Sequence, residues 1–184
     1  METNNDKRVH MTFDDQIDYF ARRAPSHIAG FVTADVGDLG LGFGGHGEEI
    51  AIAYRLRCSC GHDQFAVSAC LWNANQLIAP VTAACAMCAK GLVVFDSEQH
   101  GYNPVACEMP AGLHGQKEEG TALVPISTSD DAKPVFVVAY YPDDLFEDGF
   151  EEFADRRSDL FTWLRIAIGL KDDPENLLLD FECA

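Results

Sequence analysis

Four cysteines in the middle of the chain have the type and spacing of ligands for one metal ion. They form two close pairs, Cys58 with Cys60 and Cys85 with Cys88, separated by residues 61–84. Thiolate sulfurs bind zinc tetrahedrally in structural sites, and two short strands with a turn would bring four of them to one ion. The spacing therefore predicts a structural Zn²⁺ site with Cys58, Cys60, Cys85 and Cys88 as ligands.

The second pair is similar to a rubredoxin-type knuckle, because Cys85-Ala-Met-Cys88 is followed shortly by Gly91. On this basis, residues 50–103 resemble the zinc-ribbon superfamily. The resemblance implies that backbone N–H groups of the CxxC turn point at the sulfurs. The first pair, Cys58-Ser-Cys60-Gly61, is one residue shorter than the usual CxxCG and departs from the family pattern.

Other side chains in or beside the segment are alternative ligands. His62, Cys70 or His100 could each replace one of the four cysteines, although Cys70 falls within a predicted strand, where a free cysteine behaves as a small hydrophobe. Iron is the alternative metal, since four thiolates in a tetrahedron also hold it. Redox chemistry of the thioredoxin type is disfavoured, because no helix is predicted after Cys88.

The charge of the chain excludes some partners. Thirteen basic and 30 acidic residues give a net charge of -17, which repels nucleic acid and anionic membrane surfaces. Residues 143–184 hold 13 of the acidic and 4 of the basic residues, so the excess is concentrated towards this end. We therefore expect a protein partner with a basic surface.

The amino-terminal residues 1–11 lack the apolar segment of a secretory signal, and no apolar run in the chain is long enough to cross a bilayer. These features predict a cytoplasmic protein. In a reducing compartment, seven cysteines favour metal binding over disulfides. The odd number fits four ligands and three further thiols.

Hydrophobic patterns predict the elements that position the cysteines. A helix is expected at 13–23, capped by Thr12, and alternating residues predict strands at 49–57, 65–71, 76–82 and 92–95. The first strand would deliver Cys58 at its end. The cysteine turns would then face each other at the ends of neighbouring strands.

The second half of the chain predicts the main core. Strands are expected at 121–127 and 134–141, joined as a hairpin, and the apolar second strand should lie centrally in a sheet. A long helix is expected at 143–168, with one apolar stripe formed by Phe146, Phe150, Phe153, Leu160, Leu164 and Ile168. The predicted fold is α+β. A mostly antiparallel sheet contains the zinc-ribbon-like unit, and residues 12–184 form one domain after a disordered tail.

Two further motifs do not carry function in this context. Gly40, Gly42 and Gly45 match the letters of a dinucleotide fingerprint, but a strand is predicted after them where that motif needs a helix. The glycine-rich stretch 37–47, with His46, is therefore expected to be a loop. The acidic residues at 143–155 do not have the ligand spacing of an EF-hand.

No catalytic pattern is visible, so we expect a zinc-stabilised binding protein without enzyme activity, such as an inhibitor or immunity-type antagonist of a basic protein. One alternative is a metal-assisted hydrolase that uses His62, His100 or His114. Four cysteine ligands would close the position that catalytic zinc leaves open for water. The other alternative is a sensor whose thiolates release the metal on oxidation.

Overall fold

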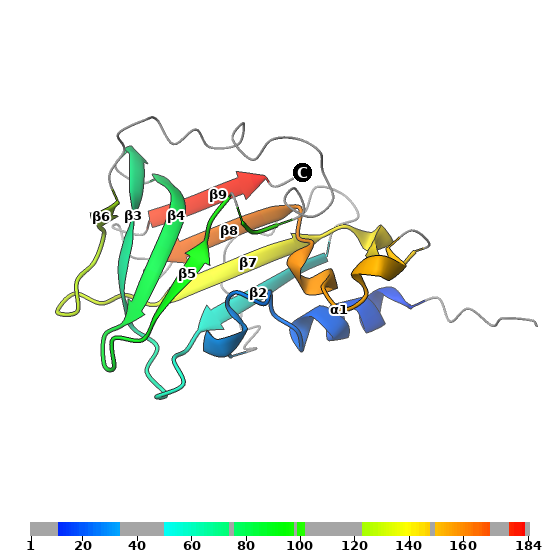
Figure 1. The fold of residues 1–184 in the computed structure, drawn as a ribbon, viewed down its shortest axis with the longest axis horizontal. Helices are drawn as coiled ribbons and strands as arrows, with labels where there is room; N and C mark the ends of the chain where they lie inside the picture. Colours follow the sequence, from blue (N-terminus) through cyan, green and yellow to red (C-terminus); the bar gives the residue numbers. More distant parts are fainter. Residues whose placement is uncertain are drawn as a thin grey trace, which may run out of the picture.

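A computed structural model of the 184-residue chain describes residues 11–33, 50–73, 76–97, 99–101, 123–147, 150–169 and 177–182 (Figure 1). The helical elements are α1 (Phe13–Ala21), η1 (Ala29–Phe31), η2 (Asp143–Phe146), η3 (Glu151–Phe153) and η4 (Arg157–Asp159), of which only α1 is an α-helix. The strands are β1 (Val32–Thr33), β2 (Ile50–Leu56), β3 (Phe65–Asn73), β4 (Gln76–Cys85), β5 (Gly91–Phe95), β6 (Val124–Pro125), β7 (Val135–Tyr141), β8 (Trp163–Ile168) and β9 (Leu177–Glu182).

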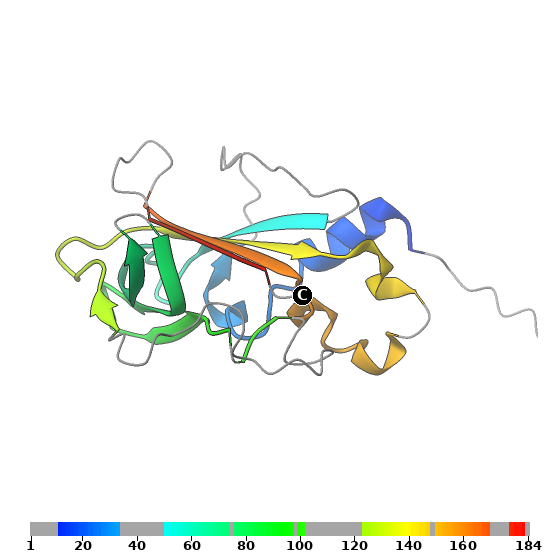
Figure 2. The same cartoon turned by 90° about the horizontal axis from the view of Figure 1, so that it is seen from above.

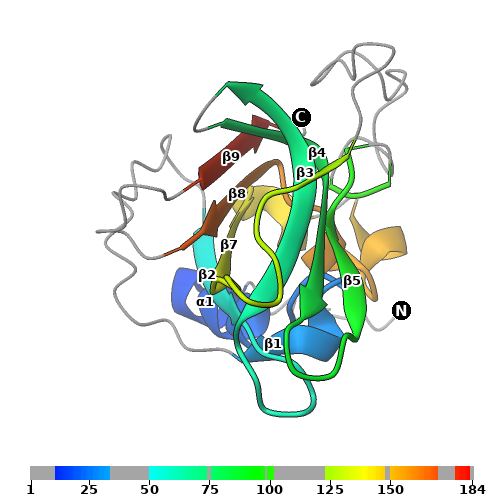
Figure 3. The same cartoon turned by 90° about the vertical axis from the view of Figure 1, so that its left-hand side faces the viewer.

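The strands form two antiparallel groups. The large group has the order β1-β2-β7-β8-β9, and the small group has the order β6-β3-β4-β5. One parallel pair, Gln76 with Leu178, connects β4 to β9 and makes the two groups a single strongly bent sheet. Figures 2 and 3 show the small group crossing one face of the large group.

The main hydrophobic core lies between the two groups. The period-two pattern of β2 turns Ile50, Ile52, Tyr54 and Leu56 inward, where all four are buried. Side chains of the small group, including Phe65 and Val81, belong to the same buried cluster. The burial of apolar side chains from both groups therefore holds the bent sheet together.

Strand β7 is buried along its whole length, as its nearly continuous apolar sequence predicts. It pairs with β2 on one side and β8 on the other. Val135, Val137, Ala139 and Tyr141 lie in the main core, while Val138 and Tyr140 form a second small cluster with Ala53 on the opposite face. The predicted central position of residues 134–141 is confirmed.

Helix α1 begins where the sequence predicts. The Thr12 hydroxyl accepts a hydrogen bond from the backbone N–H of Asp15, and the Asp15 carboxylate accepts one from the backbone N–H of Thr12. The Thr12 hydroxyl also donates to the Asp15 carboxylate at 2.7 Å, and this bond, together with the one from the Thr12 N–H, lowers the pKa of Asp15 and keeps a negative charge at the positive end of the helix. The helix ends at Ala21, two residues before the predicted end at Arg23.

The prediction of an α+β fold with a long carboxy-terminal helix is wrong: the structure is mostly β. Within the described residues 143–147 and 150–159 the chain forms the short 3-10 segments η2, η3 and η4, and residues 163–168 form β8. Leu164, Ile166 and Ile168 alternate inward along β8, which pairs with both β7 and β9. Because Leu164 and Ile168 fit a helical stripe and a strand equally well, pairing with neighbouring strands decided the outcome.

Two other predictions about the sheet differ from the structure. Residues 121–127 and 134–141 do not form a hairpin, because β6 pairs with β3 while β7 pairs with β2 and β8. The strands predicted around the cysteines are present as β2 to β5, but β2 belongs to the large group and the other three to the small group. The predicted tail, apart from Met11, and the glycine-rich loop 37–47 lie outside the described residues.

Among the described residues, no helix combines the length and the apolar character needed to cross a lipid bilayer.

Helix α1 packs on the sheet through Phe20, whose ring stacks on the Tyr141 ring at 3.8 Å between centroids. The backbone carbonyl of Phe20 also accepts a hydrogen bond of 2.9 Å from the Tyr54 hydroxyl. Phe20 therefore anchors α1 on the inner face of the large group.

We predict that Phe20→Ala lowers the free energy of unfolding by about 3–5 kcal/mol, because it leaves a cavity where a fully buried ring packs on Tyr141. Phe13→Ala in the same helix is the matched control. Its ring is 54% exposed, so we expect a change within about 0.5 kcal/mol. Urea unfolding at equilibrium measures both values, and equal losses would contradict the observed packing of α1.

Candidate metal centre

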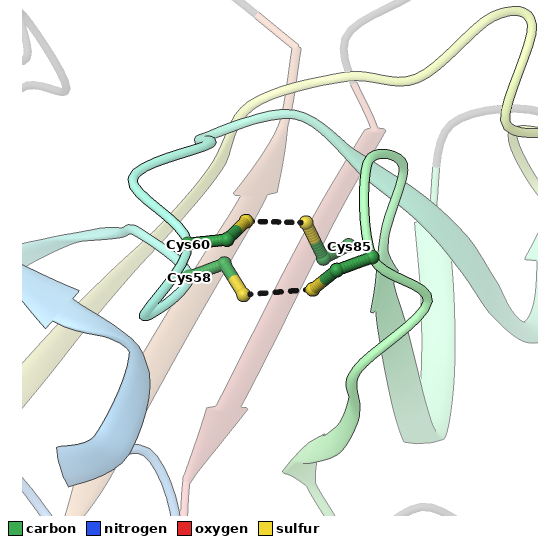
Figure 4. Close-up of side chains that lie close together, drawn as sticks. Cys58, Cys60 and Cys85 are labelled. Carbon is green, nitrogen blue, oxygen red and sulfur yellow. Dashed lines mark hydrogen bonds between the residues drawn. The ribbon is translucent and has the colours of Figure 1, made fainter.

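The two cysteine turns come from different groups of strands. Cys58 lies two residues after the end of β2 in the large group, and Cys85 is the last residue of β4 in the small group. Figure 4 shows the turn with Cys58 and Cys60 facing the turn with Cys85. The candidate centre therefore bridges the two halves of the bent sheet.

The four sulfurs have the spacing of a tetrahedral ligand set. All four lie within 4.8 Å of one another. Cys58 Sγ is 3.4 Å from Cys88 Sγ, and Cys60 Sγ is 3.6 Å from Cys85 Sγ. A tetrahedron with Zn–S bonds of about 2.3 Å has edges of about 3.8 Å. The cluster fits one metal ion with small adjustments of the side chains.

The burial of the four residues alternates between the pairs. Cys58 and Cys85 are only 3% and 2% exposed and belong to the main core, whereas Cys60 and Cys88 are exposed. One residue of each turn therefore anchors it in the core, and the other closes the cluster on its solvent side. If all four sulfurs bind a tetrahedral metal ion, no coordination position of the ion remains for a water molecule.

The first turn is shaped by backbone hydrogen bonds. The N–H of Cys58 donates to the carbonyl of His62, and the N–H of Gly61 donates to the carbonyl of Cys58, each at 2.8 Å. Gly61 has a φ of +90°, a conformation that side chains with a Cβ rarely adopt. The short Cys58-Ser-Cys60-Gly61 sequence therefore makes a tight turn without the extra residue of the CxxCG pattern.

The second turn is closed in the same way. The N–H of Cys85 donates to the carbonyl of Lys90 at 2.9 Å, and the N–H of Ala89 donates to the carbonyl of Cys85 at 2.8 Å. Ala89 has a φ of +57°, which bends the chain back towards β5. A further bond of 3.1 Å, from the N–H of Ala86 to the carbonyl of Gln64, links the second turn to the segment after the first.

Backbone N–H groups also point at three of the sulfurs, as the resemblance implied for the second turn. The N–H groups of Cys60, His62 and Lys90 donate to the sulfurs of Cys58, Cys60 and Cys88, respectively. Such bonds stabilise thiolate charge. Each turn thus supplies both the sulfurs and the donors that favour their deprotonated form.

In the absence of a metal ion, the four thiols shift one another's pKa values strongly. The hydrogen bond from the backbone of Cys60 lowers the pKa of Cys58 to about 6. The backbone of His62 lowers the pKa of Cys60, but partial loss of water around its sulfur and hydrogen bonds with the other three thiols raise it to about 12. Once one cysteine is a thiolate, the other thiols lose their protons less readily. A divalent cation would offset this effect, because it binds thiolates directly and neutralises their charge.

The residues considered as substitute ligands do not join the cluster. Among the described residues, the group of potential metal ligands contains only Cys58, Cys60, Cys85 and Cys88. Cys70 is buried in β3, and the ring of His100 stacks on His27. His62 contributes its backbone to the first turn. His46 and His114 lie outside the described residues.

Sequence reasoning missed two features of this region. It did not single out His27, whose ring stacks on His100, because a histidine without a metal-ligand spacing carries no signal in the sequence. It also placed the two cysteine turns on neighbouring strands, whereas β2 and β4 are not paired. The close cysteine spacings alone were sufficient to find the cluster.

Comparisons with protein-family models, with curated proteins and with solved structures find no match to this chain. The zinc-ribbon resemblance is therefore limited to the two cysteine turns. Their geometry is compatible with a knuckle of that type, and the four thiols could hold a metal ion. The strand order around them comes from this structure itself.

We predict that Cys60→Ala reduces bound metal from about one ion per chain to nearly none, and lowers the free energy of unfolding by several kcal/mol. Structural zinc contributes on the order of 10 kcal/mol in zinc-finger peptides. Because Cys60 is exposed, the loss of its sulfur removes little packing. Elemental analysis and urea unfolding measure the two effects.

Ser59→Ala is the matched control, since Ser59 is an exposed neighbour whose hydroxyl lies 3.5 Å from Lys90 Nζ and outside the sulfur cluster. It should retain the metal. Cys70→Ala should also retain the metal, although it removes a buried side chain. Loss of metal in Cys70→Ala, or full retention in Cys60→Ala, would contradict the proposed ligand set.

Proposed function

We propose that the chain is a non-catalytic binding protein, in which a structural zinc ion joins the two halves of the sheet and an acidic surface binds a basic protein. The observation that carries this proposal is the cluster of four cysteine sulfurs within 4.8 Å. A complete thiolate set favours a metal that stabilises the fold over one that activates water. The proposed role of the zinc is therefore to hold the protein in its binding-competent shape.

Zinc is favoured by the ligand chemistry. Four thiolates in a tetrahedron suit zinc or iron, and zinc carries no redox chemistry of its own. Iron remains the alternative occupant, and elemental analysis separates the two. A metal-assisted hydrolase gains no support, because His62 and His100 contribute no ligand to the described cluster.

The acidic surface is formed by α1 and by the short 3-10 segments that stand in place of the predicted last helix. We define the acidic end as residues 13–23, 143–147 and 150–159, which contain α1, η2, η3 and η4 and lie at the right of Figure 1. The Tyr19 hydroxyl donates to the carbonyl of Ala154 at 3.3 Å, and its ring meets Phe146 edge-on at 5.1 Å. These contacts place the acidic residues of α1 beside those of the 3-10 segments.

Carboxylates outnumber basic groups on the acidic end. Its exposed acidic residues are Asp14, Asp15, Asp18, Asp144, Glu147, Glu151, Glu152 and Asp155. Its exposed basic residues are Arg22, Arg23 and Arg156. Arg22 pairs with Asp18 at 3.1 Å, and the Arg23 guanidinium lies over the Tyr19 ring. The remaining negative charge suits a basic protein and repels phosphate and anionic lipid.

We predict that Glu151→Lys/Glu152→Lys weakens binding of the partner about tenfold or more, because it reverses two exposed charges on the acidic end. Asp130→Lys/Asp131→Lys is the matched control. It makes the same change in net charge at an exposed turn between β6 and β7, outside the acidic end. Its affinity should change less than about threefold if the site and not the total charge decides binding.

The experiment has two stages. The immobilised wild-type chain captures proteins at low salt, mass spectrometry identifies them, and the purified partner is then titrated with each variant. We expect a basic partner whose affinity falls with added salt. Capture of no basic protein, or equal loss in the two double variants, would contradict this function.

A thiol sensor is a second candidate, favoured by the exposure of Cys60 and Cys88 and by the short distances between the two turns. One hydroperoxide would take two electrons from the thiolates of Cys58 and Cys88 and two protons from the solvent, forming one disulfide and releasing the metal, while the peroxide becomes water and an alcohol or a second water. If the centre is a sensor, stoichiometric hydroperoxide should release the metal within minutes. We expect a purely structural centre to retain it under the same conditions.

A further inference from the structure

The outer edge of β5 is covered by two histidine side chains. Among the described strands, β5 pairs only with β4. On its other edge, the carbonyl of Val94 lies 3.0 Å from His27 Nε2, and the backbone N–H of Asp96 donates to His100 Nδ1 at 3.0 Å. Two imidazoles thus satisfy backbone groups that would otherwise be open for pairing with another strand.

These contacts fix the protonation of both rings. A carbonyl only accepts hydrogen bonds, so His27 Nε2 carries a proton. A backbone N–H only donates, so His100 Nδ1 carries none. The two rings stack at 3.8 Å between centroids and 10° between planes, with Phe161 6.1 Å from His27 and Phe95 6.2 Å from His100. The arrangement suits two neutral imidazoles and opposes a charge on either ring.

Charged groups near the pair do not change this preference. Asp96, from the turn after β5, and Asp159, from η4, face His100 and raise its pKa, but burial lowers it more. Burial, together with repulsion by a charged His100, lowers the pKa of His27 to about 3. Both groups therefore have a lower pKa in the folded protein than the usual value of about 6.5.

We propose that His27 and His100 form an acid-sensitive latch, which holds the His27 side chain on the edge of β5 and releases it when either ring is protonated. Protonation of His100 Nδ1 removes the acceptor for the N–H of Asp96. Protonation of His27 places a positive charge against the stacked ring of its neighbour. The latch is independent of the metal centre and of the partner proposed above.

The backbone around His27 is held independently of the latch. Ile28 and Phe31 are buried in the main core, and the N–H of Ser26 donates to Asp159 Oδ1 at 2.6 Å. Release therefore concerns the His27 side chain, whose neighbour Ser26 borders a cavity of about 630 Å³. Release would remove the hydrogen bond between the carbonyl of Val94 and His27 and the one that the N–H of Asp96 donates to His100, so acid would uncover this edge of the sheet.

The test compares the wild-type protein with His27→Gln/His100→Asn. The Gln amide can donate to Val94 as Nε2 does, and the Asn oxygen can accept from Asp96 as Nδ1 does, but neither side chain titrates. Urea unfolding at pH 7.5 and 5.0 gives the unfolding constants. Hydrogen exchange of the Asp96 amide, corrected for its intrinsic rate, reports local opening.

The unfolded chain binds a proton on each histidine below about pH 6.5, whereas folded His27 does not until about pH 3. Stability should therefore be lost as the pH falls. From pH 7.5 to 5.0 the unfolding constant of the wild type should rise about 30-fold more than that of the double variant, for His27 alone. The Asp96 amide should exchange faster at pH 5.0 only in proteins that keep both histidines.

Equal pH dependence in the wild type and the double variant would overturn the latch. Nuclear magnetic resonance of the wild-type ring protons gives a second test that does not need a folded variant. The His27 signals should stay constant between pH 7.5 and 5.0. A titration midpoint near 6.5 would overturn the proposal, because the ring would then be solvated and not held on the edge of β5.

Discussion

Two groups of antiparallel strands share one core, and the structure depends on what holds these groups together at their ends. At one place, a single parallel pair between Gln76 and Leu178 joins β4 to β9. At another, β2 and β4 lead into two tight turns whose four cysteine sulfurs converge. A metal ion bound there would add a strong link between halves of the sheet that are otherwise held by side-chain packing and by a few backbone hydrogen bonds. The same ion would relieve the mutual repulsion of four thiolates.

The four-cysteine cluster and the acidic end differ in how their negative charges are stabilised. The four sulfurs need N–H donors and a cation, and the turns supply the donors through their own backbone. Most carboxylates of the acidic end are instead stabilised by water, because they are exposed on α1 and in and around the short 3-10 segments. Tyr19 and Phe146 pack beneath this end and join it to the core. The two regions can therefore serve stability and binding separately, which is the division of roles that we propose.

Much of the local structure was predictable because it is set by neighbouring residues. Thr12 and Asp15 define the start of α1, alternation defines β2, and the apolar run of β7 places it inside the sheet. The cysteine spacings identified the cluster without any knowledge of strand order. Such features depend on periodicity, capping and short-range geometry, which a sequence carries directly.

The parts that were wrong depend on distant contacts. Leu164 and Ile168 are compatible with a helix, and only pairing with β7 and β9 makes them a strand. The assignment of β2 and β4 to different groups follows from the shared core and not from the residues between them. The stacking of His27 on His100 joins residues that are far apart in the sequence and have no common motif. Tertiary packing therefore overrode local preference at these positions.

X-ray absorption at the zinc edge, on the purified 184-residue chain, tests the central claim most directly, because it reports the identity of the metal and its first shell of ligands together. We expect one zinc ion surrounded by four sulfur atoms at about 2.3 Å. A shell containing nitrogen or oxygen, or a protein that binds no zinc when zinc is supplied during folding, would contradict a closed four-cysteine centre.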